Sequence, residues 1–321
     1  MKKQWSVAIL GATGAVGREM LRVLEQRDFS VGQLRLLASP RSAGQQLWFR
    51  GQPLSVEAAR ADSFRGCDLV LGAADSGTAR RFAPHIRESG AVFVDNSSAF
   101  RLDPAVPLVV PEVNREAAGG HRGILANPNC CTIILLTALG GIHRLSPIRS
   151  LRVCTYQAVS GAGADGLREL ERQLAGDRTC QVFPAPILGN LIPRIGEEDA
   201  RGETAEERKL RDEGRKILGV PHLAVDCTCV RVPVARCHSM AVTVETETPV
   251  TPEQARAAVA AAPGCLLTGL PMPLDASGQD LVHVGRVRSA GDGRGIALWC
   301  CGDQLRKGAA TNAVQIAELL D

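Results

Sequence analysis

The feature that most constrains the fold is the stretch "GATGAVG" at 11–17, which lies between two different hydrophobic patterns. The run "WSVAIL" (5–10) before it is typical of a buried strand, and "GREMLRVLEQRD" (17–28) has the apolar spacing of a helix. Glycine in such a turn permits unusual φ angles, and the N-terminus of the helix offers unpaired N–H groups to a pyrophosphate. The combination predicts a dinucleotide-binding unit, with a plain tight turn as the alternative.

Further short apolar runs alternate with helical segments in the first part of the chain, at 34–39, 67–74 and 91–96. This alternation predicts an α/β fold with an N-terminal, Rossmann-type doubly wound parallel sheet. After about residue 147 the pattern changes to long alternating strands separated by helices, which predicts a second domain of α+β character. The apolar spacing at 308–320 predicts a last helix that returns to the first domain. We therefore expect one domain over 1–129, completed by 303–321, and another over 130–302.

Composition and charge narrow the class of protein. The 321 residues are 45% hydrophobic and 22% charged, as in ordinary globular proteins of about two domains. No apolar run approaches the roughly 18 residues of a membrane span, and the start lacks a signal-peptide pattern, so we expect a cytoplasmic protein without a membrane partner. The net charge of +3 comes without a basic patch, which argues against nucleic acid and for a small-molecule partner.

The eleven cysteines are odd in number and lie mostly in apolar segments. This distribution favours free thiols over a disulfide framework. Because the sequence contains no Cys-x-x-Cys or His-x-x-x-His spacing, we expect no metal site.

The turn after the second expected strand bears on the choice of dinucleotide. NAD sites usually place an acidic residue there, but this chain has "ASPRSAG" (38–44), with Arg41 and Ser42 and no acid. A cation beside a hydroxyl fits a 2′-phosphate, which predicts NADP(H). The alternative is that Arg41 is an ordinary surface arginine.

Two adjacent cysteines in "NPNCCT" (127–132) stand between a turn and the helical run 130–141. A helix N-terminus favours a thiolate and lowers its pKa, so a cysteine at this junction is a candidate nucleophile. The alternative is a small buried apolar residue, which is the commoner role of a free cysteine.

The stretch "RVPVARCHS" (231–239) carries a second candidate pair. Arg231 suits a carboxylate, which it can hold by two parallel hydrogen bonds, and His238 suits proton transfer near neutral pH. An ordinary salt-bridging arginine and a partly buried histidine are the alternative.

These residues resemble the aspartate-semialdehyde dehydrogenase family, and the resemblance runs nearly end to end. Seven stretches match the family's signatures in its order: "GATGAVG", "SPRSAG", "DNSSAFR" (95–101), "NPNCCT", "YQAVSGAG" (156–163), "RVPVARCHS" and "LRKGAATNAVQIAELL" (305–320). The resemblance implies NADPH-dependent reduction of L-aspartyl 4-phosphate to L-aspartate 4-semialdehyde and phosphate, a step in lysine, threonine, methionine and isoleucine biosynthesis. It also implies a homodimer or dimer-based tetramer, with the second domain for catalysis and dimerisation.

The resemblance assigns roles to individual residues. Cys130 is the nucleophile that forms a thioester, His238 is the acid/base, and Gln157 orients the substrate. Five residues bind the substrate, with Arg231 on the α-carboxylate, Glu207 on the ammonium, and the remainder at the phosphate: Arg101, Asn129 and Lys209. Twelve residues bind the cofactor: Gly11, Thr13, Gly14, Ala15, Val16, Gly17, Ser39, Arg41, Ser42, Ser160, Gly161 and Asn312. Gln304 stands where the family more often has Asn, and we expect it to affect only a loop near the cofactor.

Two other functions fit parts of the sequence. An N-acetyl-γ-glutamyl-phosphate reductase would share the Cys/His chemistry and NADPH, but Glu207 and "NPNCCT" argue against it. A catalytically silent paralogue that binds only nucleotide would not need Cys130, Gln157, Arg231 and His238 together.

Overall fold

The computed structural model describes residues 3–291, 293 and 295–320, and the chain divides into two compact units. The first unit contains the residues up to Asn129 and those from Ala309 onward, and the second runs from Cys130 to Gly308. We predicted that 303–308 would belong with the C-terminal helix, but this segment lies in the second unit. The reason is that the Asp303 carboxylate accepts hydrogen bonds from Arg236 Nε at 2.6 Å and Gly278 N at 2.7 Å.

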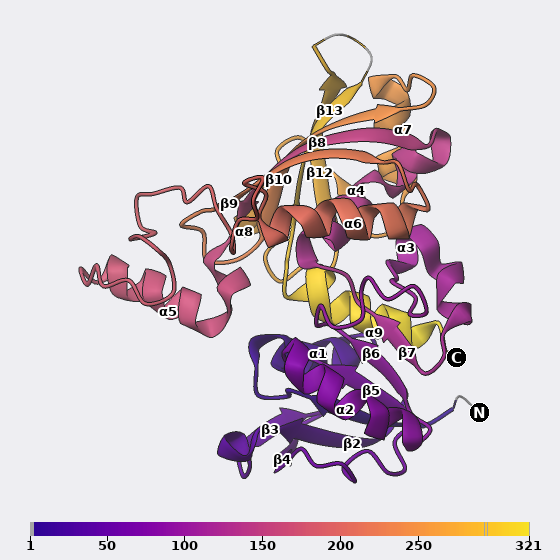
Figure 1. Cartoon of the computed structure of the whole chain (residues 1–321), viewed down its shortest axis with the longest axis vertical. Coiled ribbons are helices and arrows are strands. Elements are labelled where there is room, and N and C mark those ends of the chain that lie inside the picture. Colours follow the sequence, from indigo (N-terminus) through magenta and orange to yellow (C-terminus); the bar gives the residue numbers. More distant parts are fainter. Residues whose placement is uncertain (1–2, 292, 294, 321) are drawn as a thin grey trace. The chain divides into compact units, whose positions relative to one another are not determined.

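The first unit contains a seven-stranded sheet in the order β3-β4-β2-β1-β5-β6-β7, and Figure 1 labels these strands except β1. All neighbouring pairs are parallel except β3 with β4. The strands are β1 (Trp5–Leu10), β2 (Val31–Ala38), β3 (Gln46–Phe49), β4 (Gln52–Ala58), β5 (Leu69–Gly72), β6 (Val92–Asp95) and β7 (Ile124–Ala126). The helices are α1 (Ala15–Gln26), α2 (Ser76–Glu88), α3 (Pro111–Asn114) and α9 (Thr311–Glu318).

The strand order reverses at β1, which pairs with β2 on one side and β5 on the other. This confirms the predicted doubly wound sheet. In such sheets a ligand binds beyond the carboxyl ends of the strands where the order reverses, and here the glycine-rich turn follows β1 at that point.

Side chains alternate between two cores on the two faces of this sheet. Val7 and Ile9 pack in one cluster with α1 and with Ala313, Val314 and Ala317 of α9. The return of the last helix to the first unit is therefore confirmed, and Arg27 holds Glu318 through two hydrogen bonds of 2.7 and 2.6 Å.

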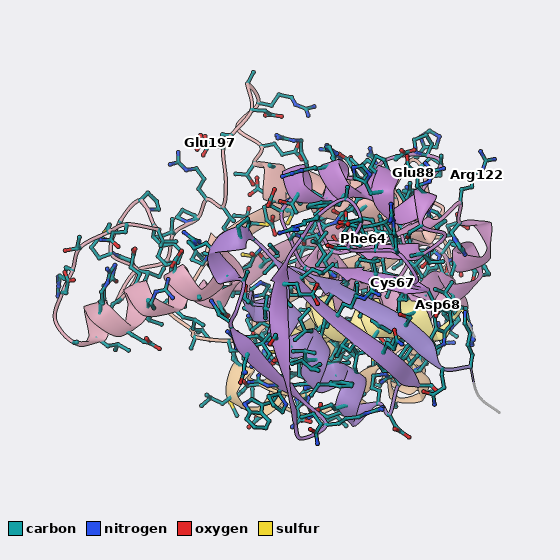
Figure 2. All side chains as sticks on the ribbon, turned by 90° about the horizontal axis from the view of Figure 1, so that it is seen from below. Phe64, Cys67, Asp68, Glu88, Arg122 and Glu197 are labelled. Carbon is teal, nitrogen blue, oxygen red and sulfur yellow. The ribbon has the colours of Figure 1, made fainter. Side chains whose placement is uncertain are left out.

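The second core of this unit contains Phe64, which packs edge to face on Phe82 of α2 with ring centroids 5.5 Å apart. Phe64 lies near Cys67 and Asp68, which directly precede β5 (Figure 2). Burial raises the pKa of the Cys67 thiol, as expected of a structural cysteine.

The second unit contains a six-stranded mixed sheet in the order β11-β12-β13-β10-β8-β9. Its strands are β8 (Ile148–Gln157), β9 (Ala224–Arg231), β10 (His238–Thr246), β11 (Cys265–Leu267), β12 (Val282–Ser289) and β13 (Ile296–Gly302). Its helices are α4 (Cys130–Leu145), α5 (Gly163–Leu174), α6 (Ala205–Leu218), α7 (Pro252–Ala261) and α8 (Pro273–Ala276).

The two faces of the second sheet differ. The helices α4, α6 and α7 pack against the sheet and one another, and α4 and α6 are seen beside it in Figure 1. Leu151 and Val153 of β8 are buried, whereas Arg152 between them is exposed and Cys154 is half-buried. On the side of Cys154, Tyr156 packs on Trp299 with ring centroids 5.2 Å apart.

All eleven cysteines are free thiols. Among the described residues, no helix has both the length and the apolar character needed to cross a membrane.

Candidate active site

The glycine-rich turn after β1 depends on two of its three glycines for backbone packing. Gly11 has a φ of 91°, and a Cβ there would lie 2.7 Å from the carbonyl carbon of Ala73. A Cβ at Gly17 would lie 2.3 Å from the Gly11 carbonyl oxygen. Both positions therefore exclude side chains, which lets α1 start close against β1.

Gly14 differs from the other two glycines, because a Cβ there would meet no atom closer than the Gly11 oxygen at 3.4 Å. Gly14 is the N-cap residue of α1, and it has no side chain that could accept a hydrogen bond from the helix N–H groups. The first turn that follows contains no acidic residue. Thr13, Ala15 and Val16 beside it are partly exposed. This uncapped helix N-terminus can receive an anionic group such as a pyrophosphate.

The turn after β2 is a short 3₁₀ segment, Pro40–Ser42. Ser39 and Arg41 are exposed and Ser42 is half-buried, and none of the residues 38–44 is acidic. The turn thus presents a guanidinium and hydroxyls to solvent at the carboxyl end of the strand next to β1.

Three other predicted residues of the first unit are buried and bonded within it. Arg101 donates from Nε to Asn127 O at 2.9 Å and from Nη2 to Asn96 O at 2.7 Å. Asn312 donates from Nδ2 to Val109 O and to Asn127 Oδ1, at 2.9 and 2.7 Å. Asn129 is buried as well. The amide nitrogen of Asn312 therefore supports the loop that precedes Cys130.

In the second unit, three predicted residues meet at one edge of the sheet. Gln157 ends β8, Arg231 ends β9 and His238 begins β10. Gln157 and Arg231 are register partners, and the antiparallel β10 brings its first residue to the same edge. All three side chains are buried. Because β8 and β9 are parallel and β10 is antiparallel to β8, the sheet topology accounts for this grouping.

Cys130 is the first residue of α4, and its thiol lies in a cluster with Cys131 and His238. The two sulfur atoms and a ring nitrogen of His238 all lie within 4.8 Å of one another. The pKa of Cys130 is held well below its ordinary value, chiefly by a hydrogen bond from the Cys131 thiol and then by His238, while burial and the Glu206 carboxylate oppose this. The pKa of Cys131 is raised by burial and by its bond to Cys130. Cys130 is the partly exposed member of the pair, and the lowered pKa favours its thiolate form, with Cys131 as the hydrogen-bond donor.

The orientation of His238 is set by a backbone group. Ala158 N donates to His238 Nδ1 at 3.1 Å, so the neutral imidazole carries its proton on Nε2. Nε2 is buried and has no conventional hydrogen-bond partner in the described part of the chain, which leaves it available to the Cys130 sulfur. Two thiols and an imidazole could also hold a thiophilic metal ion, but a protonated Nε2 has no lone pair for a metal. This tautomer suits proton transfer.

Arg231 lies against the turn η3 (Val159–Ala162), which follows β8. Its Nη1 donates to Ala158 O at 2.7 Å, and burial lowers the pKa of its guanidinium. A Cβ at Gly161 would lie 2.6 Å from Arg231 Nη1 and 3.1 Å from His238 Cε1. A glycine therefore lets this turn approach both side chains, and Ser160 in the same turn is buried.

Glu207 was expected to bind the substrate ammonium, but both of its carboxylate oxygens accept hydrogen bonds within the fold. Oε2 accepts from Thr204 N at 2.7 Å in the capping box of α6, and Oε1 accepts from Cys229 N at 3.0 Å. The neighbouring Glu206 instead bonds Lys209 Nζ at 2.9 Å and lies 3.5 Å from Gln157 Nε2. The missed signal was the spacing, since residues 206 and 209 share one helix face.

Two family models cover most of the chain. The semialdehyde dehydrogenase NAD binding domain matches 6–121, and the semialdehyde dehydrogenase dimerisation domain matches 139–307. An aspartate-semialdehyde dehydrogenase from Synechocystis sp. is 50% identical over 98% of this chain and 96% of the relative.

The chain is also similar to solved structures of aspartate semialdehyde dehydrogenases. The crystal structure of aspartate semialdehyde dehydrogenase II from Vibrio cholerae, complexed with ASA, has a TM-score of 0.97 and 44% identity, covering 99% of this chain and 98% of that one. The Candida albicans aspartate semialdehyde dehydrogenase with NADP has a TM-score of 0.79 and 24% identity, again over 99% of this chain and 98% of that one, and it shares the fold.

Proposed function

The chain belongs to the aspartate-semialdehyde dehydrogenase family, and on that premise we propose that it interconverts L-aspartyl 4-phosphate and L-aspartate 4-semialdehyde plus phosphate with NADP(H). The observation that carries this proposal is the cluster of Cys130, Cys131 and His238, with the pKa of Cys130 lowered. A thiolate at a helix N-terminus is a suitable nucleophile for acyl transfer from an acyl phosphate.

Cys130 performs the covalent step. Its thiolate attacks the acyl carbon of aspartyl phosphate, a C–S bond forms, and the C–O bond to phosphate breaks. The product is a thioester on Cys130, with phosphate leaving as the anion. Cys131 donates its S–H to the thiolate before attack and after the aldehyde leaves, and so helps to keep the sulfur ionised at neutral pH.

His238 carries the proton between the thioester and the free aldehyde. The imidazole first takes a proton from solvent; reduction of the thioester then adds a hydride to the acyl carbon and leaves an oxygen anion, which takes that proton. When the C–S bond breaks, the imidazole accepts that proton again and the Cys130 thiolate is regenerated.

The substrate is held by residues whose charges complement its own. We assign Arg231 to the α-carboxylate and Gln157 to orientation of the substrate beside Cys130. Glu206 takes the ammonium in place of Glu207, because its carboxylate reaches Gln157 and raises the pKa of Cys130.

The phosphate is assigned to cationic and amide side chains, each described within its own unit. Lys209 contributes from α6, where it is paired with Glu206. In the first unit we assign Arg101, whose guanidinium is fixed by two backbone carbonyl groups, together with Asn129. A fixed guanidinium binds a phosphate with little loss of side-chain entropy.

The first unit fits a dinucleotide, because Gly14 leaves the N-terminus of α1 without a cap or a side chain. NADPH, when bound, supplies the hydride. We assign Gly11 to Gly17 to its pyrophosphate and Ser39, Arg41 and Ser42 to its 2′-phosphate. We also assign Ser160 and Gly161 to the cofactor, as well as Asn312, which supports the loop on which Asn127 lies.

The second unit provides the surface for assembly. We assign a homodimer or dimer-based tetramer to the chain, because the matched dimerisation model covers this unit. Arg152 and the Tyr156–Trp299 pair lie on the sheet face opposite the packed helices and would be covered by a second copy. We expect the assembly to act in the cytoplasm. Sedimentation velocity checks the assembly, and a species of monomer mass at micromolar concentration contradicts it.

Phosphate-dependent formation of NADPH from aspartate semialdehyde tests the function. We expect turnover with phosphate, none without it, and little with N-acetylglutamate semialdehyde, whose acylated amine cannot pair with Glu206. Activity only on the acetylated compound would assign the chain to the N-acetyl-γ-glutamyl-phosphate reductases. No activity on either, with intact NADPH binding, would indicate a silent paralogue.

A further inference from the structure

The turn that follows β13 is anchored firmly within the second unit. Asp303 is fully buried, and its carboxylate accepts hydrogen bonds from Arg236 Nε, Gly278 N and Leu305 N at 2.6, 2.7 and 2.9 Å. The next residue is Gln304, so its side chain extends from a fixed backbone.

The Gln304 carboxamide joins two segments that are far apart in the sequence. Its Oε1 accepts from Cys237 N at 2.8 Å, and its Nε2 donates to Ser160 Oγ. Only 3% of the residue is exposed, so water does not replace these bonds when the side chain is lost. We expected Gln304 to affect a loop near the cofactor, but these contacts lead to the catalytic histidine.

The first segment is the backbone directly before His238. Cys237 has a φ of 76°, in the left-handed region that a side chain with a Cβ rarely adopts. The conformation turns its N–H toward Gln304 and directs the chain into β10, whose first residue is His238. A hydrogen bond at Cys237 N therefore fixes the point from which the imidazole projects.

The second segment is the turn η3, which lies against the imidazole ring. Ala158 N donates to His238 Nδ1, and a Cβ at Gly161 would lie 3.2 Å from Nε2. The turn is also held by backbone bonds from Val159 N to Val234 O at 2.9 Å and from Ser160 N to Ala235 O at 3.4 Å. The Gln304 side chain adds a further link between this turn and Cys237.

We infer that Gln304 is a positioning residue for the proposed reaction, because its carboxamide fixes the two backbone segments that hold His238. This inference rests on the proposed role of His238 as acid/base. The ionisable groups that act on the cluster include Cys130 and Cys131 on α4, Cys229 and Arg231 on β9, and Glu206 on α6. In the described part of the chain Gln304 bonds Cys237 N and Ser160 Oγ rather than any of these groups, so its effect passes through the backbone.

The test compares Gln304→Met with Gln173→Met. Gln173 is a matched control, because it is also buried in the second unit and its Oε1 accepts from Leu188 N at 2.9 Å, away from the histidine. Each variant is measured for Tm, for kcat and KM with aspartate semialdehyde, and for the pH dependence of Cys130 alkylation by iodoacetamide, followed by peptide mapping.

For Gln304→Met we expect kcat to fall about 10- to 100-fold, part of the factor that acid–base catalysis supplies, with KM changed less than about threefold. The midpoint of Cys130 alkylation should rise by about one pH unit, because the imidazole no longer lies against the thiolate. Gln173→Met should lose a similar amount of Tm and keep both the kcat and the midpoint of the parent protein.

An unchanged alkylation midpoint in Gln304→Met, or a shift equal to that of Gln173→Met, would overturn the inference and leave Gln304 a structural residue. If Gln304→Met does not fold, Gln304→Asn decides. Its shorter side chain cannot span both partners, so an intermediate midpoint supports the inference and the parent midpoint contradicts it. Should the parent protein lack phosphate-dependent activity, the proposed function fails, while the alkylation experiment still tests the positioning of His238.

Discussion

The helices α1 and α4 both begin after a strand and a short turn, and neither has an acidic residue in its first turn. They differ in the residues at the start, since α1 follows Gly14, which has no side chain to cap it, whereas α4 opens with Cys130 and Cys131. At α1 the absent side chain leaves the backbone N–H groups open to a ligand. At α4 a thiol occupies the same kind of position, where the helix N-terminus favours its ionised form.

The comparison teaches that a helix N-terminus provides a favourable place for negative charge, and the first residues decide whether that charge is bound or reacts. The N-terminus of α4 involves more side-chain partners than the N-terminus of α1. Cys130 has a thiol donor at Cys131 and an imidazole at His238, and the imidazole is in turn held by a backbone N–H. The binding end at α1 needs only the two glycines that admit the helix.

The largest effect should follow from removing the sulfur of Cys130. We expect Cys130→Ser to lose more than about 10⁴-fold in kcat, because a serine hydroxyl remains protonated where the thiol ionises. The phosphate-dependent assay measures this, and NADPH binding by fluorescence serves as the control and should be unchanged. An active Cys130→Ser enzyme would show that the start of α4 is a binding end like that of α1.

The next largest effect should come from His238→Ala. We expect kcat to fall by about 10²- to 10⁴-fold, the range of general acid–base catalysis. Because the imidazole helps to lower the pKa of Cys130, its loss should raise that pKa and slow alkylation of Cys130 at neutral pH, with the rate recovering as pH rises. A pH profile of alkylation equal to that of the parent protein would assign the ionisation of Cys130 to Cys131 and the helix alone.

At the α1 end, Arg41→Ala should distinguish the two dinucleotides. A charge-assisted bond to a 2′-phosphate is worth about 2 kcal/mol, so the Kd of NADPH should rise about 30-fold while that of NADH stays within about threefold. Titration of both cofactors by fluorescence measures this. Equal weakening of both would make Arg41 a structural residue of the turn after β2.

The glycines of α1 should separate binding from folding. Gly14→Ala has space for its methyl group, so we expect a native Tm but about tenfold weaker NADPH binding, equivalent to ~1.4 kcal/mol. Gly17→Ala meets the Gly11 carbonyl oxygen and should destabilise the unit by about 3 kcal/mol. Denaturant unfolding and cofactor titration check the pair. Tight NADPH binding by Gly14→Ala would mean that the pyrophosphate does not approach this helix end.

The smallest effect is expected at Cys131. The hydroxyl of Cys131→Ser still donates to the Cys130 thiolate, so kcat should stay within about threefold. Cys131→Ala removes the donor, and the Cys130 alkylation midpoint should move to higher pH. The two variants differ only in the donor, so equal midpoints would show that the bond from Cys131 contributes nothing to the ionisation.

The features of the fold and the site that could be predicted from the sequence are those formed by one continuous segment of the chain. The strand, glycine turn and helix of 5–28 are local, and so is the thiol at the start of α4. What could not be predicted depends on contacts between distant segments. Ala158 N has no side-chain signature, and its bond to His238 joins residues 80 positions apart.

The choice between Glu206 and Glu207 also depends on contacts between distant segments. Glu206 and Glu207 are adjacent in "EERK", and the sequence alone does not say which of the two side chains points toward the edge of the sheet. The fold decides, because Glu207 is drawn into the capping box with Thr204 and into a bond with Cys229 N. Helical spacing to Lys209 would have favoured Glu206.

The division of the chain has a consequence for the order in which the protein is made. The first unit needs Ala313, Val314 and Ala317 to cover one face of its sheet, and these residues leave the ribosome after the whole of the second unit. The contiguous second unit can therefore fold during synthesis, while the first waits with an uncovered apolar face for its last helix. Nascent chains that stop before Thr311 should be the ones that chaperones retain.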